Sequence, residues 1–202
     1  MRPALPLMLA LAFGSVCLAA DSLPPIQDGK VPQNLTELWG AYDPRAEALE
    51  AEVTKEWEQD GIVCRVIRYR IGTFKGQPAT MAAFYAFPKG AKGLPAILQI
   101  HGGGQSASLS AVVTNAKLGY ASLSLNWGGN KMTLADGKIY DGLNTDWGAL
   151  DATHPPQHNK VSHFAGGTAP DDFTLDAVDS PRNDNWFLVT LAARRGLTFL
   201  QS

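Results

Sequence analysis

The stretch "ILQIHGGGQSAS", residues 97–108, decides how the chain is interpreted. An apolar run ends at His101, three glycines follow, and small polar residues come next. Without side chains, backbone N–H groups can face a cleft and approach a ligand closely. Such donors stabilise the negative charge that develops on a carbonyl oxygen under attack. A phosphate cradle is the competing chemistry, but neither G-x-G-x-x-G nor G-x-x-x-x-G-K-[ST] is present, and a plain turn stays open as an alternative.

The segments on either side of this stretch predict a strand–helix–strand unit. Residues 96–100 are predicted to form a strand buried on both faces, since they are mostly apolar. Residues 108–117 are predicted to form a helix that ends at Gly119, and residues 120–127 a further strand. Strand, helix and strand at this spacing indicate a crossover with parallel strands.

Earlier and later segments complete the predicted organisation. Residues 62–74 alternate apolar and basic side chains and, with residues 78–88, predict an antiparallel hairpin. Residues 46–60 are predicted to form a short amphipathic helix, within an N-terminal arm that covers residues 21–60. The segment 130–180 is rich in Gly, Asp and Pro and is predicted to be a long loop, of a length that is usually either functional or disordered. A largely apolar helix is predicted from Ser180 onward, so that residues 61–202 make one α/β domain.

The first twenty residues predict a secretory signal peptide. Arg2 precedes a short apolar stretch and small residues, with cleavage expected after Ala19 or Ala20. The stretch is shorter than a membrane span of about 20 residues, so a secreted or periplasmic protein is expected, with no membrane attachment after cleavage. The net charge of -2 gives no support for a nucleic-acid partner. Cys64 then remains the only thiol and is expected to be a small buried hydrophobe.

The long loop contains the remaining candidates for chemistry. Three histidines with two nearby aspartates resemble a metal site, but the two prolines of "THPPQH" forbid the helix that would bring the first pair together. A solvated loop is therefore favoured, and neither metal nor cofactor is predicted. The residues concerned are Asp151, His154, His158, His163 and Asp171.

Aromatic residues surround the same loop. Trp127 and Trp147 are candidates for contact with substrate, and with Phe164 and Trp186 they would form a stacking surface for a sugar. Packing of the loop onto the sheet is an equally good interpretation of the same residues.

The order of these segments resembles the first half of an α/β-hydrolase. The resemblance runs from about residue 60 onward and is carried by "PAILQIHGGGQSAS", "YASLSLNWGG", "TDWGALDAT" and "TLDAVDSPRNDNWFLVTLAARRGLTFL". Within that superfamily the chain is similar to secreted bacterial acetylxylan esterases and dienelactone-hydrolase-type proteins. The resemblance implies an oxyanion hole with backbone donors at Gly103 and Gly104, a loop-fixing role for His101, and a small-molecule or polysaccharide ester as substrate.

The resemblance also implies residues that this sequence does not contain. The superfamily uses a serine on a strand-to-helix turn, commonly G-x-S-x-G, followed by an acid and a histidine. No G-x-S-x-G occurs here, and Ser106 lacks both a strand immediately before it and a glycine after it. We therefore expect an incomplete α/β-hydrolase fold, truncated before the nucleophile strand, that lacks the nucleophile, acid and base.

The expected activity is that of a serine carboxylic-ester hydrolase acting on acylated carbohydrate, with this chain inactive on its own. In the superfamily's sheet the strand at residues 96–100 would lie beside the missing strand, so the chain is also expected to be poorly soluble. Two alternatives remain: a non-catalytic carbohydrate-binding module, and a fragment of a prolyl-oligopeptidase-type peptidase.

Overall fold

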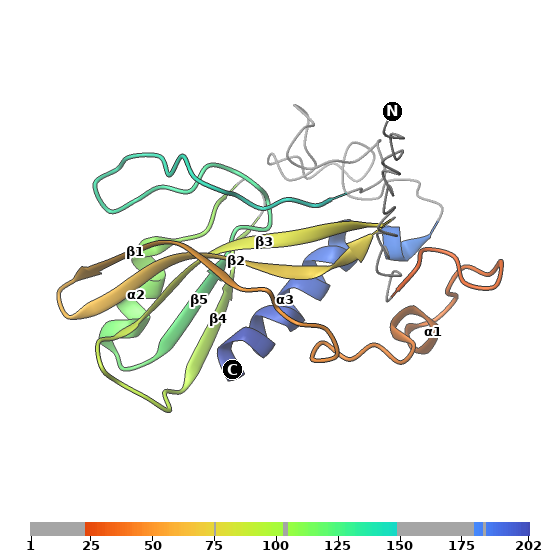
Figure 1. The fold of residues 1–202 in the computed structure, drawn as a ribbon, viewed down its shortest axis with the longest axis horizontal. Coiled ribbons are helices and arrows are strands. Elements are labelled where there is room, and N and C mark those ends of the chain that lie inside the picture. The colour runs from red at the N-terminus through yellow and green to blue at the C-terminus, as the bar shows by residue number, and fades with distance from the viewer. Residues whose placement is uncertain (1–22, 75, 103–104, 149–179, 184) are drawn as a thin grey trace, which may run out of the picture.

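Five strands form one mixed sheet in the computed structural model, which describes residues 23–74, 76–102, 105–148, 180–183 and 185–202 (Figure 1). The elements in chain order are α1 (Leu35–Trp39), β1 (Glu52–Gln59), β2 (Ile62–Phe74), β3 (Gln77–Pro88), β4 (Ala96–Ile100), α2 (Leu109–Lys117), β5 (Ala121–Leu125), the 3-10 helix η2 (Pro181–Asn183) and α3 (Asn185–Gln201).

The sheet has the strand order β1-β2-β3-β5-β4. The pairs β1–β2, β2–β3 and β3–β5 are antiparallel, whereas β4 and β5 are parallel. The predicted hairpin and the predicted parallel crossover are therefore both confirmed. Strand β4 pairs with β5 on one side only within the described part of the chain, so it lies at an edge of the sheet.

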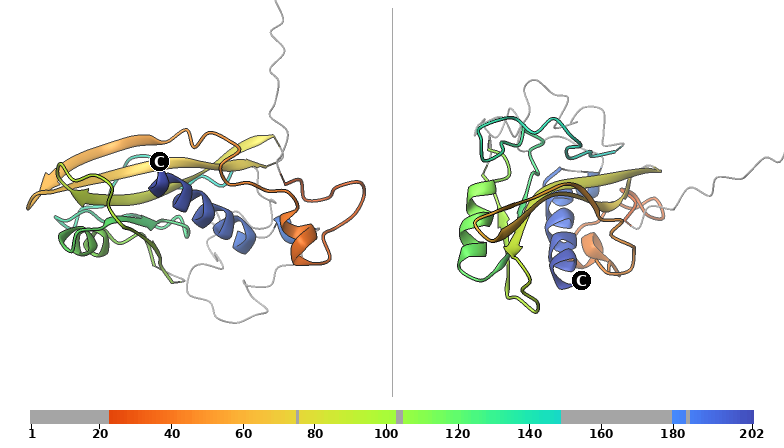
Figure 2. Two further views of the ribbon diagram at one scale, coloured as in Figure 1. Left: turned by 90° about the horizontal axis from the view of Figure 1, so that it is seen from below. Right: turned by 60° about the vertical axis from the view of Figure 1, so that its left-hand side comes forward.

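Two helices cover opposite faces of this sheet (Figure 2). Side chains alternate along each strand, so one face of β2 presents Cys64 and Val66 and the other presents Ile67 and Tyr69. The first set packs in the cluster that contains the buried side of α2, and the second set packs with α3. The result is a three-layer α/β/α arrangement with a core on each side of the sheet.

Helix α2 forms where the sequence predicts it. Ser108 caps its first turn by accepting a hydrogen bond from the backbone N–H of Ala111. The apolar residues Leu109, Val112 and Ala116 are buried against the sheet, and Gly119 turns the chain into β5 with a φ of +93°. The predicted helix at residues 108–117 is confirmed.

The predicted helix at residues 46–60 is wrong, because residues 52–59 form the edge strand β1 instead. The segment is rich in Ala and Glu, which favour helices, but pairing with β2 overrides that preference. Asp60 and Gly61 have φ values of 51° and 74°, which two-residue hairpin turns require. The Asp-Gly pair was the available signal for this hairpin, which sequence reasoning missed.

Strand β4 has the predicted position but not the predicted burial. Residues 96–100 were expected to be buried on both faces, whereas Ile100 is 51% exposed and no residue of the strand is fully buried. The physical reason is the position of β4 at the sheet edge, where β5 is its one strand partner among the described residues.

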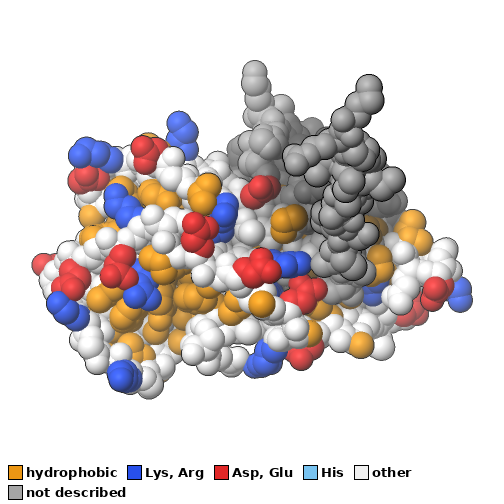
Figure 3. Space-filling view, in the orientation of Figure 1, with side chains coloured by type: hydrophobic (Ala, Val, Ile, Leu, Met, Phe, Trp, Pro, Cys, Tyr) orange, Lys and Arg blue, Asp and Glu red, His pale blue; other side chains and the backbone are white. Residues whose placement is uncertain are grey.

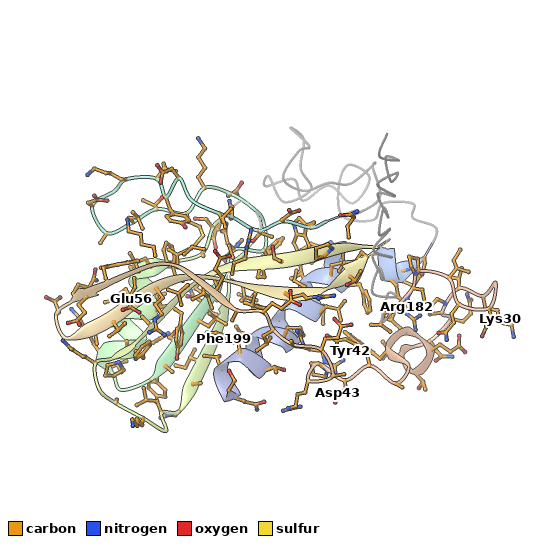
Figure 4. The ribbon with its side chains drawn as sticks, in the orientation of Figure 1. Lys30, Tyr42, Asp43, Glu56, Arg182 and Phe199 are labelled. Carbon is orange, nitrogen blue, oxygen red and sulfur yellow. The ribbon has the colours of Figure 1, made fainter. Side chains whose placement is uncertain are left out.

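Two buried arginines attach the N-terminal segment to the C-terminal helices. Arg182 donates to the backbone carbonyls of Pro24, Glu37 and Leu38, and Figure 4 shows its side chain beside that segment. Arg195 in α3 donates to the carbonyls of Pro44, Glu47, Ala48 and Arg70. Residues more than 140 positions apart in the sequence are thus joined through hydrogen bonds to charged donors, which are stronger than neutral ones.

Cys64 is a free, fully buried thiol in β2, as the sequence predicts. Burial raises the pKa of this thiol to about 11, so it stays protonated at neutral pH. Among the helices that the structure describes, none has the length and apolar character needed to cross a membrane.

Candidate active-site loop and cleft

The carboxyl ends of β4 and β5 meet at one edge of the sheet and position the candidate site. Ile100 pairs with Leu125 at the ends of the two parallel strands. His101 directly follows β4, and Asn126 and Trp127 directly follow β5. Residues 101–108, which we call the glycine loop, then connect β4 to α2. This edge is where open α/β sheets bind their ligands.

His101 is held in the glycine loop by three contacts. Its Nδ1 atom lies 2.8 Å from the Gly102 carbonyl oxygen, which only accepts, so Nδ1 carries the proton. Its ring stacks on Trp127 with the ring centroids 4.8 Å apart, and the Trp127 Nε1–H donates to the His101 carbonyl at 2.7 Å. Burial lowers the pKa of His101, although the hydrogen bond to Gly102 acts in the opposite direction. A neutral ring bonded to its own loop has the contacts that a loop-fixing role requires.

Side chains from the loop and from β5 hold the described backbone of the glycine loop. The Gly102 N–H donates to the Gln105 side-chain oxygen at 3.0 Å, and the Gln105 N–H donates back to the Gly102 carbonyl at 3.3 Å. The Ala107 N–H donates to Asn126 Oδ1 at 2.9 Å, and the Ser108 N–H donates to Ser124 Oγ at 3.0 Å. Four amides of the loop are therefore already paired and are not available to a ligand.

A cleft of about 880 Å³ opens beside the glycine loop and helix α2. No charged side chain occurs among the described residues that line it, and the neutral His101 ring is one of its walls. The lining consists of hydroxyl, amide and small apolar side chains: Gln59, Gln99, His101, Gln105, Ser106, Ala107, Ser108, Leu109, Ser110, Val113, Thr114, Thr133, Leu134 and Ala135. Such a surface suits a neutral polar ligand better than an anion.

The predicted oxyanion donors Gly103 and Gly104 lie outside the described residues. Ser106 lines the cleft in the glycine loop, six positions after the last residue of β4. It is therefore not at a sharp strand-to-helix turn of the kind that presents a nucleophile. The candidate metal residues between 151 and 171, and Phe164, also lie outside the described residues. Within the described ranges no group of three or more His, Cys, Asp or Glu side chains could hold a metal ion.

The tryptophans named as substrate-loop candidates are buried. Trp127 is 2% exposed and Trp147 is 0% exposed, and both belong to the core cluster on the α3 side of the sheet. Neither ring faces solvent, so the structure corrects the stacking-surface interpretation of these two residues in favour of core packing. Trp186 in α3 is 42% exposed, and its ring centroid lies 5.4 Å from that of Trp127.

Sequence reasoning missed the asparagines that surround the glycine loop. Asn126 is fully buried and bonds to Ala107, Asn130 and Asn144, and the Asn130 side chain donates to the Gln105 carbonyl at 2.9 Å. The "NWGGN" sequence at residues 126–130 was the available signal, since two asparagines follow a strand that ends beside the loop.

No family model and no curated protein matches this chain. Among solved structures, the chain is similar to an acetyl xylan esterase from Paenibacillus sp. R4, with a TM-score of 0.50 and 18% sequence identity. The match covers 78% of this chain and 43% of that chain, so it spans less than half of the esterase. The fold of this mixed α/β protein thus resembles part of an esterase structure.

Proposed function

We propose that this chain forms the oxyanion-hole side of an exported serine ester hydrolase with an α/β-hydrolase fold. The observation that carries the proposal is the glycine loop, which follows a parallel strand, borders a cleft and has its amides at Gly102, Gln105, Ala107 and Ser108 already paired. The donors that the proposal assigns to the substrate are the amides of Gly103 and Gly104.

The chemistry follows from where charge develops. Attack on an ester carbonyl places negative charge on its oxygen, and fixed N–H donors stabilise that charge without reorganisation. His101 serves this loop as a positioning residue, since its Nδ1 proton is bonded to the Gly102 carbonyl. The proposal assigns the nucleophile, acid and base to polypeptide outside these 202 residues, because no G-x-S-x-G occurs among them.

The cleft supports acylated carbohydrate as the substrate class. Its described lining carries hydroxyls and amides and no formal charge, so it matches the neutral, hydroxyl-rich surface of a sugar. Small apolar residues such as Ala107 and Leu109 leave room for a short acyl group. The likeness to an acetyl xylan esterase agrees with this class.

We also propose that the protein is exported through the leader at residues 1–20. Expression in a bacterium would then give a product outside the cytoplasm, with its N-terminus near Ala20 or Asp21. N-terminal sequencing checks this, and an exported product that still begins at Met1 would contradict it.

The proposed activity is tested on the longer protein that is expressed when the reading frame is continued past codon 202. We call this the read-through protein. We expect a G-x-S-x-G within about twenty residues, and saturable hydrolysis of an activated acetyl ester that is lost when its serine is changed to alanine. Acetylated xylan and a prolyl peptide substrate are assayed in parallel. Hydrolysis of the peptide alone would favour the peptidase alternative, and sugar binding without any hydrolysis would favour the binding module.

A further inference from the structure

We propose that Asn126 and Asn130 are positioning residues that fix the backbone of the glycine loop. The inference rests on the proposed function for its catalytic meaning, but its structural part stands on hydrogen bonds alone. Asn126 lies directly after β5, and its side chain is completely buried between three segments of the chain.

Both the oxygen and the nitrogen of the Asn126 carboxamide form hydrogen bonds. Its Oδ1 accepts the Ala107 N–H at 2.9 Å, and its Nδ2 donates to the Asn130 carbonyl and to Asn144 Oδ1, both at 2.7 Å. The Asn130 side chain then reaches the glycine loop at a second point, where it donates to the Gln105 carbonyl at 2.9 Å. The loop is therefore held at residues 105 and 107 by one connected set of amides.

Asn144 completes this set from a third segment. Its Nδ2 donates to the Gly129 carbonyl at 3.0 Å, and its Oδ1 accepts the Thr145 N–H at 2.8 Å. Because Asn126 is fully buried and both ends of its carboxamide are paired, a shift of this side chain would leave a buried donor or acceptor without a partner. The network thus holds the backbone at residues 105 and 107 in place before a ligand arrives.

The backbone N–H groups of the glycine loop are mostly paired, which shows where the loop is held. Gly102, Gln105, Ala107 and Ser108 all have partners for their N–H groups, whereas the Ser106 N–H has no hydrogen-bond partner within the described residues. Residues on both sides of Gly103 and Gly104 are consequently fixed. An oxyanion hole depends on donors that are already in place when charge develops.

Aspartate substitutions separate this role from simple packing. Asn126→Asp keeps the size and the acceptor for Ala107, but it cannot donate to Asn130 or to Asn144. Asn130 is exposed, so Asn130→Asp should fold, while it loses the donor to Gln105. Asn115→Asp is the matched control, because Asn115 is a partly buried asparagine in α2 whose Nδ2 donates to Ser122, away from the loop.

The experiment is hydrogen–deuterium exchange with mass spectrometry on the 202-residue chain. We expect Asn126→Asp and Asn130→Asp to increase exchange in a peptide covering residues 101–108 by about tenfold or more, with little change in peptides from β2 and β3. Asn115→Asp should leave the loop peptide unchanged. Unchanged exchange in the loop for both Asn126→Asp and Asn130→Asp would overturn the inference.

A kinetic measurement on the read-through protein tests the catalytic part separately. Asn130→Asp should lower kcat about tenfold or more with KM nearly unchanged, as expected when transition-state stabilisation is lost. An equal loss with Asn115→Asp would contradict the positioning role. If the read-through protein has no hydrolase activity at all, the proposed function fails, and the exchange experiment still decides whether the asparagines hold the loop.

Discussion

The two edge strands of the described sheet, β1 and β4, differ in charge and in regularity. Strand β1 carries Glu52, Lys55, Glu56 and Glu58, has an irregularity between Val53 and Lys55, and forms ion pairs such as Arg65–Glu56 at 2.6 Å. Strand β4 has no charged residue, and its last residue, Ile100, is 51% exposed. Figure 3 shows hydrophobic side chains between charged groups on the face of the molecule that Figure 1 presents. Charges and bulges are the usual means by which sheet edges avoid pairing with other chains. The β1 edge thus has the charges and the irregularity that oppose pairing with other chains, and the described β4 edge has neither.

The β4 edge is also the edge that carries the glycine loop. This placement links the unprotected strand to the proposed activity, because a catalytic residue supplied beside β4 would stand next to the loop and its cleft. The β4 edge should therefore differ from the β1 edge in function, in association and in stability.

The largest effect is expected in the glycine loop. In the read-through protein, Gly103→Pro removes one backbone N–H and should lower turnover of an activated acetyl ester by about 10²–10³. Gly103→Ala is the control, since it keeps the N–H. Unchanged turnover in the proline variant would show that Gly103 is not an oxyanion donor.

A lysine introduced into β4 should weaken self-association, whereas a lysine introduced into β1 should not. Ile100 in β4 and Val53 in β1 are matched in exposure, at 51% and 50%. We expect the 202-residue chain to self-associate through β4, and Ile100→Lys to weaken that association by about tenfold or more, because like charges would meet across the contact. Val53→Lys should have no such effect. Sedimentation velocity measures the association, and equal behaviour of the two variants would remove the distinction between the edges.

The packing of α3 near β4 depends on a glycine. A Cβ at Gly196 would lie 2.9 Å from Tyr69 Oη and 3.3 Å from side-chain atoms of Leu98 and Leu123. Helix propensity alone would make Gly196→Ala stabilising by about 1 kcal/mol, but overpacking should prevail and lower the free energy of unfolding by about 1–3 kcal/mol. Urea denaturation measures this, with Thr190→Ala on the exposed side of α3 as the control. A more stable Gly196→Ala variant would show that α3 does not pack this closely.

The smallest effect is a pH dependence from His101. Burial holds its pKa below the ordinary 6.5, so below about pH 6.5 the unfolded chain binds a proton that the folded protein does not. The stability that the neutral ring provides is complete above about pH 6.5 and is lost as the pH falls toward the folded pKa, by at most about 1.4 kcal/mol per pH unit. Urea denaturation of the wild type and His101→Asn at several pH values isolates this slope. Identical slopes for the two proteins would show that His101 is not held neutral.

Apolar periodicity was enough to predict most of the sheet and its helices. The hairpin β2–β3, helix α2, strand β5 and helix α3 each bury at least one face, so their apolar residues mark the element in the sequence. Strand β1 lies at an exposed edge, and Trp57 is its one residue that packs partly against a described core cluster. The rest of its sequence therefore does not alternate between apolar and polar residues as a half-buried strand does. Only the Asp60-Gly61 turn indicated this strand in the sequence.

The candidate site was predictable only where its contacts are local. His101 bonds to the carbonyl of the next residue, and a histidine before three glycines made that contact easy to expect. Asn126 and Asn130 contact the loop across 19 and 25 positions of sequence, and only the pairing of β4 with β5 brings them there. The burial of Trp127 and Trp147 likewise depends on how the segment after β5 packs against the sheet.

The central claim is that these 202 residues supply an oxyanion loop and an uncharged edge strand, β4, but no nucleophile. The most direct test is the rate at which the purified chain hydrolyses an activated acetyl ester, with Ser106→Ala measured beside it. We predict an associating protein, no hydrolysis above a buffer control, and no difference between the two chains, because a carbonyl polarised by backbone donors still needs a group to attack it. A soluble monomer with saturable turnover that Ser106→Ala abolishes would contradict this account.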